Sequence, residues 1–188
     1  MLRVAGRLQR AIALGLFILA APLAASAEPT YSLETGQMLA NDGLRPGQAR
    51  WLAEADTASG AVSIVVSLPL QRAYVFRGGA LVGVSTLSSG QPGYDTPVGR
   101  FTILEKDVDH RSSLYDDAPM PFMQRLTWDG VALHAGQVMA EPASHGCIRL
   151  PRAFPRRLYG MTGLGTVVVV TDQAPNAPEQ AISFASAE

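Results

Sequence analysis

A run of β-branched residues near the C-terminus predicts a buried strand at residues 166–171, with the sequence TVVVVT. Branched side chains pack well on a pleated sheet and poorly in a helix. Similar short runs, separated by turn residues, predict further strands at 61–68, 71–76, 81–87, 100–105 and 131–134. The sequence therefore predicts a mainly β fold with one or two short helices.

The segments outside these strands carry weaker signals. Pro151 begins the one convincing helix, which Gly160 or Gly163 can end. Residues 28–60 lack a sustained period and are expected to form a lead-in segment with a helical turn near 48–55. Residues 173–188, rich in Ala, Pro and Ser, predict a flexible tail. One folded domain is therefore expected at 61–172.

The first 27 residues have the organisation of a secretory signal peptide. Three arginines precede an apolar run at residues 11–21, and Ala25-Ser26-Ala27 offers the small-x-small cleavage pattern. A transmembrane anchor is the alternative, but the run is shorter than the ~20 residues that a spanning helix needs. We therefore expect export to the periplasm or cell envelope.

The composition limits the classes of partner. The chain has 188 residues, of which 47% are hydrophobic, enough apolar material for one packed domain. Lys plus Arg number 15 against 16 Asp plus Glu, for a net charge of -1. Because nucleic-acid binding proteins need a basic surplus to neutralise phosphates, we expect no nucleic-acid partner.

The candidate chemistry lies in a short segment that holds the chain's one cysteine. Cys147 follows His145 and Gly146, and His134 ends an expected strand nearby. A lone cysteine often only fills core space, but an adjacent imidazole can take a thiol proton and create a nucleophile. An imidazolium beside Cys147 would lower the pKa of the thiol below ~8.5 and favour alkylation near neutral pH. The amides of Gly146 and Cys147 are candidate donors to an oxyanion.

Three sequence features together resemble the L,D-transpeptidase catalytic domain of the YkuD type, over residues 61–171. These are the string Ser144-His145-Gly146-Cys147-Ile148-Arg149-Leu150, the upstream His134, and Thr96-Pro97-Val98-Gly99-Arg100-Phe101. The resemblance implies a β-sandwich-like fold around a cysteine pocket. It also implies action on peptidoglycan stem peptides outside the cytoplasmic membrane, so the domain at 61–172 is expected to be catalytic.

The resemblance assigns roles to individual residues. Cys147 is the implied nucleophile and His134 the implied proton acceptor and donor, while Ser144, His145, Gly146 and Arg149 form the surrounding motif. His145 remains an alternative base, since residues two apart on a strand share a face; otherwise its ring is expected to satisfy backbone groups. Arg149 is expected to be a hydrogen-bond hub or a carboxylate anchor.

The implied reaction is an acyl transfer through a Cys147 thioester that needs no metal or organic cofactor. The acceptor amine comes from a second stem or from an outer-membrane or wall-anchored protein, and carbapenems are expected inhibitors. Hydrolysis of the same thioester, by an L,D-carboxypeptidase or endopeptidase, is the first alternative. A zinc site at His134, His145 and Cys147 and a non-catalytic wall-binding protein are the others. A monomer is expected.

Overall fold

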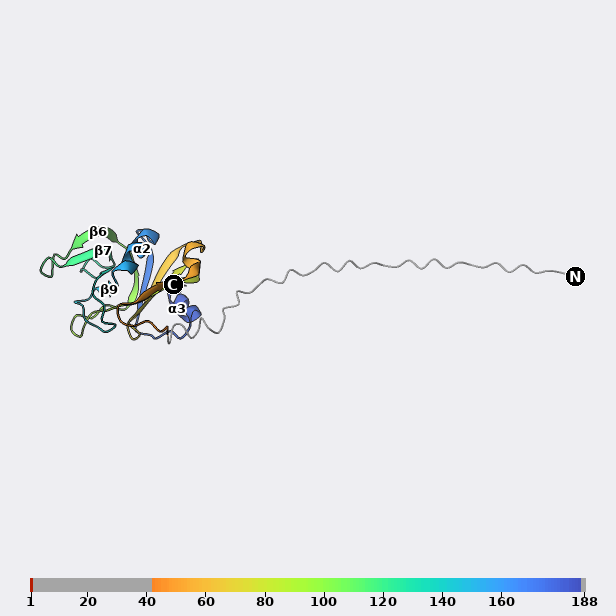
Figure 1. The fold of residues 1–188 in the computed structure, drawn as a ribbon, viewed down its shortest axis with the longest axis horizontal. Coiled ribbons are helices and arrows are strands. Elements are labelled where there is room, and N and C mark those ends of the chain that lie inside the picture. Colours follow the sequence, from red (N-terminus) through yellow and green to blue (C-terminus); the bar gives the residue numbers. More distant parts are fainter. Residues whose placement is uncertain (2–41, 187–188) are drawn as a thin grey trace. The chain divides into compact units, whose positions relative to one another are not determined.

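The computed structural model describes Met1 and residues 42–186. The predicted signal peptide beyond Met1, and residues 28–41 of the lead-in segment, lie outside the described residues. The described chain forms a six-stranded and a four-stranded sheet (Figure 1). The elements are β1 (Ala49–Trp51), η1 (Ala53–Asp56), β2 (Val62–Ser67), β3 (Arg72–Arg77), β4 (Ala80–Thr86), β5 (Gly99–Thr102), β6 (Glu105–Arg111), β7 (Pro119–Arg125), β8 (Ala132–Ala135), β9 (Ile148–Leu150), α2 (Ala153–Met161), β10 (Val167–Thr171) and α3 (Pro178–Ser186).

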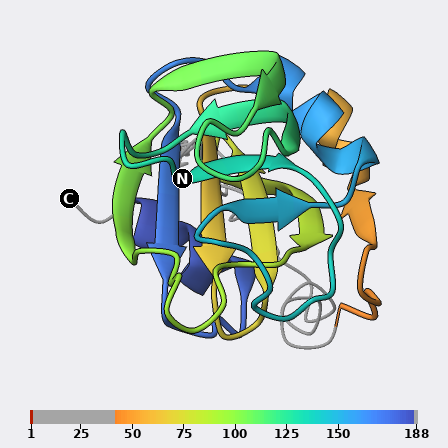
Figure 2. The ribbon, with the colours of Figure 1, turned by 90° about the vertical axis from the view of Figure 1, so that its left-hand side faces the viewer.

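The valine strand β10 lies inside the larger sheet, whose order is β1-β4-β3-β2-β10-β5. It pairs with β2 in parallel and with β5 in antiparallel orientation, and Figure 2 shows it in blue beside the yellow-orange β2. Val168 and Val170 enter one hydrophobic core, whereas Val169 enters a second core on the opposite face. Burial on both faces explains why this strand is a continuous apolar run rather than an alternating one.

The first core joins the two sheets. Leu133 of β8 and Ile148 of β9 pack there with residues of β2, β3 and β10, and Phe154 and Leu158 of α2 contribute to the same core. The smaller sheet has the order β6-β7-β8-β9. Two sheets packed face to face confirm the predicted mainly β, sandwich-like fold with short helices.

The flanking segments differ from their predicted structures. In the lead-in segment, the predicted helical turn at 48–55 is confirmed only in part: η1 is a short 3-10 helix at the end of this range, whereas the residues before it form β1, which pairs with β4. Where a flexible tail was predicted, residues 178–186 form α3, with Ala181 and Ala185 buried in the second core. Small alanines let this helix approach the valine face closely, so the tail contributes to the core.

The β6–β7 hairpin was not predicted as a pair of strands. The sequence of β6, EKDVDHR, is charged, and β7 contains two prolines, both of which weaken a strand signal. The hairpin instead forms the outer edge of the smaller sheet. None of the helices in the described part of the chain has the length and apolar character needed to cross a membrane.

Candidate active site

Strands β8 and β9 bring together residues that the sequence singled out. They run parallel, with Leu133 opposite Ile148 and His134 opposite Arg149. Alternate residues of a strand point to opposite faces, so Leu133 and Ile148 enter the core while His134 and Arg149 point away from it. Cys147 precedes β9 directly and shares the outer face with Arg149. Three of the predicted site residues thus meet on one face.

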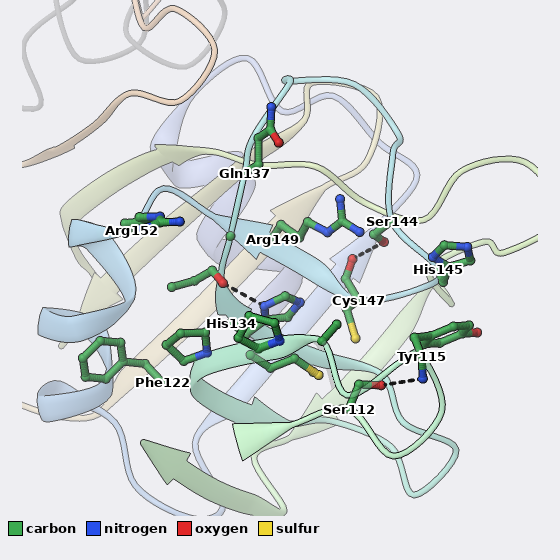
Figure 3. A pocket seen from close by; sticks show the side chains of 16 residues that line it. Ser112, Tyr115, Phe122, His134, Gln137, Ser144, His145, Cys147, Arg149 and Arg152 are labelled. Carbon is green, nitrogen blue, oxygen red and sulfur yellow. Dashed lines mark hydrogen bonds between the residues drawn. The ribbon is translucent and has the colours of Figure 1, made fainter. Parts of the chain in front are cut away.

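A cavity of about 590 Å³ opens on this face, a volume typical of ligand sites. Five of the six predicted site residues line it, namely His134, Ser144, His145, Cys147 and Arg149. The β6–β7 hairpin forms the facing wall, which includes Ser112, Tyr115, Met120 and Phe122 (Figure 3). The hairpin, whose strands were not predicted, therefore supplies one wall of the cavity.

His134 is only 7% exposed and its ring is oriented by the backbone. Its Nδ1 lies 2.9 Å from the carbonyl oxygen of Ala135. Because a carbonyl only accepts, Nδ1 carries the proton, and Nε2 of the neutral ring is left as an acceptor. The sequence left the orienting group of this histidine unnamed, and the structure identifies the Ala135 carbonyl.

Cys147 lines the cavity and packs against an apolar surface. Its neighbours are Met120, Met123 and Ala132, which form a small hydrophobic cluster of their own. The thiol donates to the carbonyl oxygen of Gly130, with Sγ 3.3 Å from the oxygen. The thiol is therefore held by a neutral acceptor in a largely apolar environment.

Burial favours the neutral forms of both His134 and Cys147. It lowers the pKa of His134 to about 4, although the hydrogen bond to Ala135 acts in the opposite direction. Burial also raises the pKa of the Cys147 thiol, and a backbone hydrogen bond from Ala132 and the charge of Arg149 oppose this effect only in part. The resting structure thus favours a thiol and an imidazole, the reverse of the thiolate–imidazolium pair expected from the sequence.

The turn before Cys147 is fixed by hydrogen bonds that link two sequence motifs. Ser144 Oγ donates to the Cys147 carbonyl and accepts from the amide of Gly146. Gly146 has a φ of +107°, a conformation that favours glycine. Thr96 Oγ1 donates to the Gly146 carbonyl at 2.8 Å and accepts from the amide of Gly90. The Thr-Pro-x-Gly segment therefore supports the cysteine turn, and the Gly146 amide is engaged by Ser144 rather than directed at an oxyanion.

His145 differs from His134 in exposure and contacts. Its ring is exposed at the cavity rim, stacked on Tyr115 at 4.6 Å between centroids and edge-on to Tyr94 at the same distance. The sequence predicted that this ring would satisfy backbone groups; instead it contacts two aromatic rings. His134, on β8, is the histidine that lies on the same strand face as Cys147.

Further lining residues had no sequence signal. Gln137 and Arg152 line the cavity, and only the fold places them beside Cys147. The Arg149 side chain lies against the backbone of Gly136 and reaches the same space. In the part of the chain that the structure describes, no three His, Cys, Asp or Glu side chains are grouped so that they could hold a metal ion.

Comparison with known proteins identifies the domain. The profile of the L,D-transpeptidase catalytic domain family, YkuD, matches residues 61–170. The curated protein named probable L,D-transpeptidase 3 of Mycobacterium tuberculosis is 29% identical over 109 residues, covering 48% of this chain and 39% of that protein. This chain thus corresponds to well under half of that relative's length.

Solved structures share the fold. A crystal structure of an L,D-transpeptidase from M. tuberculosis has a TM-score of 0.56 at 28% identity, covering 59% of this chain and 57% of its own. L,D-transpeptidase 3 of the same organism, in complex with a faropenem-derived adduct, has a TM-score of 0.55 at 27% identity, covering 59% and 60%. The extent of the family match confirms the resemblance inferred from the sequence: this chain belongs to the L,D-transpeptidase catalytic domain family.

Proposed function

We propose that this protein is an exported L,D-transpeptidase that acts on tetrapeptide stems of peptidoglycan through a thioester on Cys147. The observation that carries the proposal is the joint placement of Cys147 and His134 on one cavity face of a family domain. The N-terminal segment 1–27, with its signal-peptide pattern, supports export.

The proposed first step is acylation. Cys147 Sγ attacks the carbonyl carbon of the third stem residue while its proton passes to Nε2 of His134. The tetrahedral intermediate then breaks its C–N bond, and His134 returns the proton to the nitrogen of the departing D-alanine. The products are a thioester and free D-alanine, and His134 is neutral again. The Cys147 amide is the proposed oxyanion donor, since the Gly146 amide is already bound to Ser144.

The proposed second step transfers the acyl group. An acceptor amine gives a proton to His134 and attacks the thioester carbonyl, and the thiolate leaves and recovers that proton. The acceptor is a second stem, which yields a 3–3 cross-link, or an amine of an envelope protein. The carbonyl of Ala135 keeps Nε2 available for both steps by holding the proton on Nδ1.

A purified sample incubated with disaccharide-tetrapeptide, with the products analysed by mass spectrometry, tests this function. We expect a cross-linked dimer lacking one D-alanine, and no product from Cys147→Ser. A tripeptide product without dimers would instead identify the hydrolase, and unchanged substrate bound to the protein would identify a wall-binding protein. The faropenem-derived adduct of the relative also leads us to expect a mass increase on Cys147 after penem treatment, absent in Cys147→Ser.

A further inference from the structure

The active-site cavity continues beyond the reacting residues. Arg152, at the N-cap of α2, lines this cavity and also a second cavity of about 550 Å³. The second cavity is formed by β1, the residues before it and the start of α2. Its walls include Arg50 and the stacked rings of Trp51 and Phe154, whose centroids are 4.4 Å apart. One arginine therefore stands where the two cavities adjoin.

The charges around both cavities have one sign. Arginines are the permanently charged side chains that line them, Arg149 in the first, Arg50 in the second and Arg152 in both. Among the described residues, no aspartate or glutamate lines either cavity. The whole chain has a net charge of -1, so this concentration of positive charge is local. Concave sites lined by one sign of charge attract ligands of the other sign.

The guanidinium groups at the cavities are available to a ligand. Arg72, which lies elsewhere, is paired with Asp42 at 2.7 Å. Within the described residues, by contrast, neither Arg149 nor Arg152 has a carboxylate partner. Arg50 donates only to the backbone oxygen of Asp42, at 3.5 Å. A guanidinium presents planar donors that match a carboxylate, so these arginines suit a ligand with several carboxylates.

We infer that the two cavities form one extended groove for an acidic peptide, with carboxylates bound at Arg152 and Arg50. This inference rests on the proposed function, because the occupant is then the acidic donor stem whose scissile carbonyl lies at Cys147. The residues follow one path, from Cys147 through Arg149 on β9 to Arg152 at the start of α2, and Figure 3 shows Arg149 between the other two in its view.

The test measures peptide binding without turnover. A Cys147→Ala protein is titrated by calorimetry with a free tetrapeptide stem containing diaminopimelate, and with the same peptide after amidation of its carboxylates. Arg152→Gln and Arg50→Gln are each expected to weaken binding of the acidic peptide about tenfold, as for the loss of one charge-assisted hydrogen-bonded pair. The matched control is Arg156→Gln, since Arg156 is exposed on α2 and lines neither cavity; its affinity is expected to equal that of the parent.

The possible outcomes distinguish a failure of the groove inference from a failure of the proposed function. Equal affinities of Arg152→Gln and Arg156→Gln for the acidic peptide, or equal affinities of the parent for acidic and amidated peptides, overturn the inference. If the wild type also turns over the stem substrate, the proposed function survives that result. Binding that depends on Arg152 without any wild-type turnover supports the groove and rejects the proposed function. Arg50→Gln gives an independent result if Arg152→Gln does not fold.

Discussion

At the scale of single residues, the half-buried position of Cys147 determines how readily its thiol loses a proton. Only a thiolate is strongly nucleophilic, and burial raises the pKa of this thiol. We therefore expect alkylation by iodoacetamide to be slow at pH 7 and to rise with a midpoint above the ~8.5 of a free thiol. Intact-mass measurements from pH 6 to 10 provide the profile. A midpoint near 7 would show that the site stabilises an ion pair instead.

The two histidines should differ in their effect on rate. His134 shares the strand face with Cys147, whereas His145 makes exposed contacts with Tyr115 and Tyr94. We expect His134→Ala to reduce the acylation rate by ~10²-fold or more, the usual scale of general acid–base catalysis. His145→Ala should cost less than about tenfold, the scale of aromatic contacts. Stopped-flow assays with a penem measure the acylation rates of both variants. A larger decrease in rate for His145→Ala than for His134→Ala would exchange the two assignments.

The depressed pKa of His134 also affects stability. Its pKa is about 4 in the folded protein and 6.5 when unperturbed, so between these values the unfolded chain binds a proton that the folded protein does not. The contribution of His134 to the free energy of unfolding is therefore full above pH 6.5. It decreases as the pH falls towards 4, by about 3 kcal/mol in total. Urea unfolding at several pH values measures this loss. His134→Gln should show a smaller decrease over the same window, and an identical decrease would assign the effect to other groups.

The identity of the candidate reactive residues could be predicted from the sequence, but their protonation could not. Cys147 and His134 carry the motif, so their meeting was expected. Protonation depends on burial by Met120, Met123 and other neighbours from the β6–β7 hairpin, whose strands gave no alternating pattern. The same hairpin supplies one wall of the cavity, which includes Tyr115, Met120 and Phe122.

At the scale of elements, Thr96 connects two loops that are far apart in the chain. Its hydroxyl, buried with 4% exposure, bridges the Gly90 amide and the Gly146 carbonyl. We expect Thr96→Val to lower the free energy of unfolding by about 1–3 kcal/mol, because both backbone groups lose their partner. It should also lower turnover by shifting the turn before Cys147. Thr96→Ser keeps the hydroxyl and is the control in urea unfolding and kinetic assays. Equal free energies of unfolding and equal turnover of the two variants would show that the hydroxyl bridge does not support the turn.

Strands with a branched or alternating pattern were predicted to within a few residues, while charged or proline-containing strands were not. The predicted strand at 166–171 corresponds to Val167–Thr171, and that at 131–134 to Ala132–Ala135. The pairing partners of the strands were not predicted. For example, β2 pairs with β10, which lies far from it in the sequence. Long-range partners depend on which apolar faces meet in the fold, and a local pattern does not specify them.

At the scale of the whole molecule, two cores on opposite faces of one sheet explain why the flanking segments at 49–56 and 178–186 are structured. β1 extends the larger sheet at its β4 edge, and α3 covers the face that carries Val65 and Val169. The alanine-rich composition of the tail resembles that of a mobile segment. The same small side chains allow close packing on a valine surface once the sheet exists, and only the tertiary structure distinguishes the two cases.

This packing makes α3 part of the stable fold. Ala181 is fully buried against the second core, whereas Ser183, two residues later, is exposed. We expect Ala181→Asp to lower the free energy of unfolding by about 3 kcal/mol or more, because an unpaired charge would be buried. Ser183→Asp introduces the same charge on the solvent side and should change stability by less than ~0.5 kcal/mol. Urea unfolding of both variants measures the difference, and equal stabilities would mean that residues 173–188 behave as the flexible tail predicted from the sequence.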